Sequence, residues 1–146
     1  MKLNIDIDPE LLEEQVVMHI RRVTEKVERI RKIVETDESK GTIAVVRDDR
    51  QYILPLQQVS HLMTENGKIV AVSRKRKYFY KQSLKYFETH ANSGRFIRIS
   101  KYCLANIDWM DFFEAGFSGN LMLNFKNEWK ETVSRKYVAD LKKRLF

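Results

Sequence analysis

The chain has 146 residues, of which 43% are hydrophobic and 32% are charged, a composition typical of one folded domain rather than of a disordered or collagen-like chain. It holds no run of about 18 apolar residues, so no membrane-spanning helix is expected. The first residues lack the basic-then-apolar order of a signal peptide, and Cys103 is the single cysteine. Both observations favour the cytoplasm.

The net charge of +7 is unevenly distributed along the chain. Residues 1–40 hold 8 Lys and Arg against 10 Asp and Glu, whereas residues 41–146 hold 19 against 10. The positive field therefore belongs to the C-terminal part, and it has the sign that attracts polyanions. An ordinary lysine-rich surface of a soluble protein is also positively charged, so the charge alone does not show that the chain binds nucleic acid.

The first 40 residues predict a small extension of strand and helix. Residues 2–8 alternate between apolar and polar side chains, as a half-buried strand does. Residues 15–22 are also predicted as a strand, because β-branched side chains favour that state. Thr24 is expected to cap a short amphipathic helix. The alternative joins residues 10–35 into one helix with a short coiled-coil seam, since apolar side chains recur there every three or four residues.

From residue 41 onward, short runs of strand-forming residues are separated by turn signals such as Asn66-Gly67 and Ser118-Gly119. Strands are predicted at residues 42–47, 51–54, 59–64, 69–73, 77–80, 96–99, 104–109, 112–117, 121–125 and 131–133. A short helix is predicted at residues 83–90, and Ser134 is expected to cap a last helix. Many short strands with little helix predict a mainly β (α+β) domain of the sandwich or barrel-like kind.

No constellation of residues predicts catalysis or a metal site. His19, His61 and His90 stand apart from one another and from Cys103, without the spacings that zinc ligands need. The glycine-rich phosphate loop and the motifs of hydrolases and metalloproteases are absent from the sequence. We therefore expect no enzyme activity, no cofactor, no metal and no small-molecule substrate. Cys103 is expected to be a small buried side chain rather than a redox sensor.

Aromatic side chains are frequent between residues 109 and 129. Because they alternate with polar residues on predicted strands, we expect them in the core. A surface on which unpaired bases stack is the alternative. The residues concerned are Trp109, Phe112, Phe113, Phe117, Phe125 and Trp129, and Trp129 has the most polar surroundings.

Three basic clusters lie where loops or helix ends would expose them. Residues 74–77 form one run, residues 95–101 hold the second, and Arg135 with Lys136 begins the last helix. At a helix start, backbone N–H groups favour a phosphate, and an arginine there can reach a guanine edge. Any one of these clusters, taken alone, is most simply interpreted as a charged surface exposed to solvent. The prediction of a nucleic-acid surface therefore depends on the three clusters lying together in the fold.

Two ordered pieces of the sequence resemble the LytTR family of bacterial response-regulator output domains. Arg-Phe-Ile-Arg-Ile-Ser-Lys at residues 95–101, followed by Leu-Ala-Asn-Ile at residues 104–107, is similar to the family's central signature. Val-Ser-Arg-Lys-Tyr-Val at residues 133–138 is similar to its closing strand and helix. With an early strand pair, the likeness covers about residues 42–146. The N-terminal segment resembles that of stand-alone members, which carry a short strand-and-helix extension in place of a receiver domain.

The resemblance implies an elongated, mainly antiparallel β-sheet domain with a C-terminal helix, which binds DNA through loops that enter successive major grooves. Ser100 and Lys101 match the central contact loop, and Arg135 matches a contact at the start of the last helix. The turn with Lys68 matches a third contact region. Tyr102 departs from the family pattern, in which many members have serine, and its hydroxyl could replace the serine hydroxyl on a phosphate.

We therefore predict a sequence-specific transcription regulator that binds duplex DNA through residues 41–146, with residues 1–40 as a packing or dimerisation segment. It is expected to act as a homodimer or as paired monomers, and the resemblance implies a membrane protein as its regulator. The alternative is an RNA-binding or protein-interaction module. Base edges are expected to be read by Lys101 and Arg135. The DNA-binding residues that we expect are Lys68, Arg74, Arg76, Arg98, Ser100, Lys101, Arg135 and Lys136.

Overall fold

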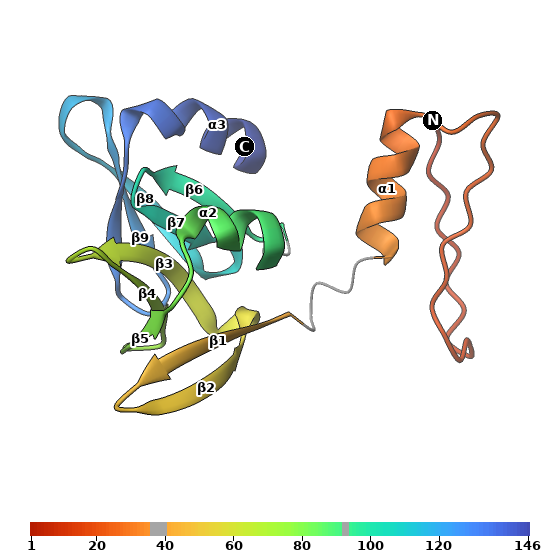
Figure 1. The fold of residues 1–146 in the computed structure, drawn as a ribbon. Coiled ribbons are helices and arrows are strands. Elements are labelled where there is room, and N and C mark those ends of the chain that lie inside the picture. Colours follow the sequence, from red (N-terminus) through yellow and green to blue (C-terminus); the bar gives the residue numbers. More distant parts are fainter. Residues whose placement is uncertain (36–40, 92–93) are drawn as a thin grey trace. The chain divides into compact units, whose positions relative to one another are not determined.

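A computed structural model describes residues 1–35, 41–91 and 94–146 of the chain (Figure 1). The chain divides into two compact units, Met1–Thr36 and Asp37–Phe146. All strands of the described residues belong to the second unit. No helix in the described ranges is long and apolar enough to cross a membrane.

The described part of the N-terminal unit holds one helix, α1 (Glu25–Glu35). Thr24 caps it as predicted, because its hydroxyl oxygen accepts a hydrogen bond of 3.3 Å from the Val27 N–H. The strands predicted at residues 2–8 and 15–22 are wrong, and so is the single helix from residue 10. An alternating segment becomes a strand only where a neighbour completes its backbone hydrogen bonds. The apolar side chains of residues 2–8 and 15–22 are largely exposed, so no packed neighbour among the described residues completes a strand there.

In the second unit, seven strands form one antiparallel sheet with the order β2-β1-β5-β4-β3-β7-β6 (Figure 1). The strands are β1 (Thr42–Arg47), β2 (Arg50–Pro55), β3 (Val59–Glu65), β4 (Lys68–Ser73), β5 (Arg76–Tyr80), β6 (Phe96–Ser100) and β7 (Cys103–Asn106). The tight turns are those the sequence predicts. Asn66 and Gly67 have φ values of 51° and 75°, the left-handed conformation that a two-residue hairpin turn needs.

A second sheet has three strands in the order β10-β9-β8. They are β8 (Met110–Ala115), β9 (Leu121–Phe125) and β10 (Lys130–Val133). The strand predicted at residues 104–109 ends at Asn106, and a 3-10 turn (Ile107–Trp109) connects the two sheets. Two helical segments complete the unit: α2 (Leu84–Tyr86), which continues into a wider turn at Phe87–Ala91, and α3 (Arg135–Leu145). The prediction of a mainly β domain with a C-terminal helix is confirmed.

Two apolar clusters form the core. The first packs side chains of the large sheet against α2, with Phe87 and Phe96 ring to ring at 5.0 Å. The second joins both sheets and α3, and here the buried His61 of β3 stacks on Phe125 of β9 at 4.5 Å. Cys103 belongs to this cluster, and burial raises the pKa of its thiol well above the ordinary value. The prediction of a buried cysteine is therefore confirmed.

The aromatic residues from 109 to 129 divide between core and surface. Phe125 is buried, and Trp109, Phe113 and Trp129 pack against the second cluster. The prediction is wrong for Phe112 and Phe117, which are exposed. Phe112 lies on β8, an edge strand of the small sheet, and Phe117 lies beyond the end of that strand.

Candidate nucleic-acid interface

Two predicted contact loops lie side by side at one edge of the large sheet. The turn from β3 to β4 closes where Glu65 pairs with Lys68. Because β3 also pairs with β7, the turn from β6 to β7 lies next to it. The Thr64 N–H donates to the Tyr102 carbonyl at 2.8 Å and holds the two turns together. Lys68 and Lys101 therefore lie at the same end of β3.

The start of α3 reaches this edge as well. The Ser134 N–H donates to the Ile99 carbonyl at 2.9 Å, one residue before Ser100. Ser134 is the N-cap residue, as predicted, but its hydroxyl makes no capping hydrogen bond. Instead, the Asn120 side-chain oxygen accepts from the Arg135 N–H at 2.8 Å. Arg135 and Lys136 are thus held beside the end of β6.

We call the residues that meet here the basic edge; they are Lys68, Ser100, Lys101, Arg135 and Lys136. Its four cationic side chains are exposed. The three lysine ammonium groups lie 5.3–5.8 Å from the ring centroids of neighbouring aromatic side chains. Within the described part of the chain, none of the four cations forms an ion pair with a carboxylate. Their charge is therefore available to an external anion.

Arg98 differs from these four residues, although the sequence places it in the same cluster. Its guanidinium pairs with Glu88, and its Nη1 donates to the Lys101 carbonyl at 2.9 Å. Its side chain is 22% exposed. Ser100 also stabilises the turn, since its hydroxyl oxygen accepts from the Tyr102 N–H at 3.2 Å. Arg98 and Ser100 therefore fix the shape of the turn that presents Lys101.

Arg74 and Arg76 lie at the opposite end of β4 from Lys68. Arg76 pairs with Ser73, the last residue of β4, whereas Lys68 is the first. Six strand residues span about 17 Å. The Asn127 and Trp129 side chains donate to the Arg74 carbonyl at 2.9 and 3.1 Å and hold this turn against the small sheet. The expectation that all three basic clusters lie together is thus wrong for the first cluster.

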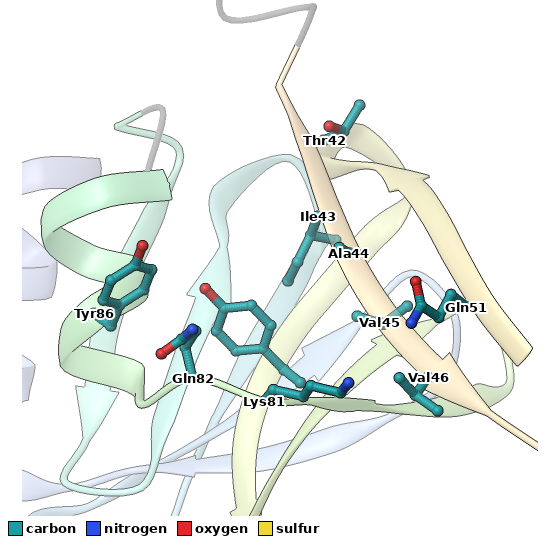
Figure 2. A pocket seen from close by; sticks show the side chains of 10 residues that line it. Thr42, Ile43, Ala44, Val45, Val46, Gln51, Lys81, Gln82 and Tyr86 are labelled. Carbon is teal, nitrogen blue, oxygen red and sulfur yellow. The ribbon is translucent and has the colours of Figure 1, made fainter. Parts of the chain in front are cut away.

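A cavity of about 340 Å³ opens between β1 and the segment that leads into α2 (Figure 2). β1 pairs with β5 at one position, Val46 opposite Phe79, and residues of both strands line the cavity. Its polar lining residues are Thr42, Gln51, Tyr80, Lys81, Gln82 and Tyr86, with neither a carboxylate nor a histidine among the lining residues. Burial and the neighbouring Tyr86 raise the pKa of Tyr80. No residue of the basic edge lines this cavity.

Known proteins share sequence and fold with this chain. The model of the LytTr DNA-binding domain family matches residues 49–146. The sensory transduction protein LytR of Streptococcus mutans is 23% identical over 137 residues, which cover 92% of this chain and 53% of LytR. LytR of Staphylococcus epidermidis is 28% identical over 98 residues, which cover 67% of this chain and 39% of that protein. The chain thus spans about half or less of the length of these LytR proteins.

Two further matches cover most of their own length. A protein named an uncharacterized HTH-type transcriptional regulator, from Staphylococcus aureus strain bovine RF122, is 25% identical over 146 residues; these cover 99% of this chain and 98% of that protein. The solved LytTr DNA-binding domain of a response regulator from Bacillus cereus superposes with a TM-score of 0.67 at 21% identity. The superposition covers 73% of this chain and 97% of the solved domain, so the two share the same fold.

Proposed function

Because this chain belongs to the LytTR family of DNA-binding domains, we propose that it binds duplex DNA directly and regulates transcription. The basic edge carries the proposal, since it gathers from three separate elements four cations that pair with no carboxylate of the described residues. Phosphates attract such a surface without regard to sequence. A relative of nearly the same span is named a transcriptional regulator, which supports the same role. The cytoplasm, where bacterial DNA lies, is the proposed location.

Lys101 and Arg135 are the proposed base-reading residues. Each projects from a turn or helix start that the sheet holds in place, as loops that enter a major groove require. Lys68 and Lys136 lie beside them and are assigned to phosphates. Arg98 positions the Lys101 turn through its hydrogen bond to the Lys101 carbonyl. Arg74 and Arg76 are still predicted to contact phosphates. Their backbone lies about 17 Å from that of Lys68, so these contacts would be separate from those of the basic edge.

Arg135→Ala and Lys101→Ala are each expected to weaken binding to a preferred duplex by about 1–3 kcal/mol and to reduce discrimination against a scrambled duplex. Lys136→Ala is expected to weaken both duplexes alike and to lower the salt slope by about one unit. The measurement is a set of binding isotherms at several salt concentrations. The preferred duplex is first selected from a random pool by the parent protein.

Arg144→Ala is the matched control for Arg135→Ala. It removes the same charge from the exposed last turn of α3. The ratio of affinities for the two duplexes should stay unchanged in this variant. If Arg135→Ala instead weakened both duplexes equally, its role would be electrostatic. If single-stranded RNA displaced the selected duplex, the protein would be an RNA-binding module rather than a regulator that reads DNA.

We further propose that the N-terminal unit associates with a second copy of the chain. Val16, Ile20 and Val23 are exposed there, together with Leu3, Ile5 and Ile7. An apolar surface of this kind is commonly covered in an assembly. The full chain is expected to sediment as a dimer, and a chain that starts at Lys40 as a monomer. A monomeric mass for both chains would exclude the N-terminal unit from any dimer. A membrane-protein regulator stays an expectation from the family resemblance.

A further inference from the structure

The turn between β8 and β9 presents an aromatic side chain to solvent. Phe117 is 92% exposed, more than the other large apolar side chains of the second unit. Two hydrogen bonds close this turn, from the Gly116 N–H to the Asn120 carbonyl at 2.9 Å and from the Asn120 N–H to the Phe117 carbonyl at 3.0 Å. Ser118 has a left-handed φ of 54°. The phenyl ring is thus displayed by a turn of defined shape.

This turn lies beside the proposed base-reading arginine. Leu121 pairs with Ala115 on one side and with Val133 on the other, so the turn and the start of α3 occupy the same end of the small sheet. The Asn120 side chain accepts the Arg135 N–H at 2.8 Å. A Cβ atom at residue 119 would lie 2.8 Å from the Arg135 Cδ, so the glycine there lets the arginine stem pass close to the turn.

We propose that Phe117 is a further DNA-contacting residue, which packs against the C5-methyl group of a thymine next to the base read by Arg135. This inference rests on the proposed function. The thymine methyl is the apolar group that the major groove presents, and phenylalanine is among the side chains that contact it. Because the turn is closed by its own hydrogen bonds, little ordering has to accompany binding. Phe117 would thus add specificity for thymine to the arginine contact.

The test replaces each thymine of the selected duplex, one at a time, by deoxyuracil, which lacks only the C5-methyl group. The parent protein is expected to lose about fourfold in affinity at one position, the effect of one buried methyl group. Phe117→Ala should bind the thymine duplex correspondingly more weakly and should no longer distinguish thymine from deoxyuracil at that position. Phe117→Leu, which keeps an apolar side chain, should retain part of the discrimination.

Phe146→Ala is the control, because Phe146 is also a largely exposed phenylalanine, 84% exposed, and follows the other end of α3. It should keep the full response to the methyl group. Equal thermal melting of the parent and Phe117→Ala would show that the fold is intact. If Phe117→Ala kept the response to the methyl group, or lost only self-association, the inference would be overturned. If no duplex were enriched from the pool, the proposed function would fail, and this inference with it.

Discussion

Phe125→Ala is expected to lower the free energy of unfolding by about 3–5 kcal/mol, the usual cost of removing a fully buried phenyl ring. Phe125 is 2% exposed and lies on the central strand of the small sheet. Its ring stacks on His61 of the large sheet, so its loss leaves a cavity where the two sheets meet. Urea denaturation, followed by tryptophan fluorescence, measures the change as a shift of the midpoint.

Phe112→Ala provides the matched control on the neighbouring strand β8. Phe112 is 48% exposed, so the same substitution should change the free energy of unfolding by less than about 1 kcal/mol. Binding of Phe125→Ala to the selected duplex, measured where the variant is still folded, should keep its sequence preference. A Phe125→Ala protein that melts like the parent yet binds DNA poorly would show that the ring belongs to a binding surface.

The strands of the second unit could be predicted because their signals are local. Alternation of apolar and polar side chains marks each strand, and residues that tolerate positive φ, such as Asn66 and Gly67, mark the hairpin turn. The N-terminal segment at residues 2–8 has an equally clear alternation, and residues 15–22 fit a strand or a helix, but neither segment forms a strand. A strand also needs a partner, and the pattern within a segment does not say whether one is present.

The site could be predicted only in part, because strand pairing decides which ends of strands lie together. Lys68 and Lys101 meet because β3 pairs with β7, which comes about 40 residues later in the chain. No local pattern contains that pairing. Arg76 lies at the other end of β4 from Lys68, because it pairs with Ser73 in the β4–β5 hairpin. The role of Arg98 escaped sequence reasoning for a similar reason, since its partner Glu88 lies on the turn that follows α2.

Phe117 was predicted as a core residue because it continues the apolar alternation of the preceding strand. The strand ends at Ala115, however, and the next residues form a closed turn. Ser118-Gly119 was itself recognisable as a turn signal, and a residue just before such a signal can belong to the turn rather than to the strand. The adjacent Ser118-Gly119 was therefore the signal that places Phe117 in the turn. The apolar alternation of the preceding strand wrongly extended that strand to Phe117.

Asn106→Leu is expected to destabilise the protein by about 2–4 kcal/mol, although leucine has the same number and branching of side-chain heavy atoms as asparagine. Asn106 is 1% exposed, and its Nδ2 donates to the Val59 carbonyl at 2.9 Å and to the Leu56 carbonyl at 3.4 Å. Its side-chain oxygen accepts from the Asp108 N–H at 3.0 Å. The side chain thus ties the end of β7 to the start of β3 and the turn before it, and leucine would leave the buried Leu56 and Val59 carbonyls without this partner.

Asn124→Leu separates this effect from simple burial. Asn124 is 4% exposed, but within the described residues its Nδ2 has no hydrogen-bond partner. Replacing a buried polar group that makes no hydrogen bond removes its desolvation penalty and breaks no interaction. Asn124→Leu should therefore lose much less stability than Asn106→Leu, or gain some. Urea denaturation of both variants gives the comparison. Equal losses would mean that the hydrogen bonds of Asn106 contribute nothing beyond packing, whereas a loss confined to Asn106→Leu would identify them as the link between β7 and the start of β3.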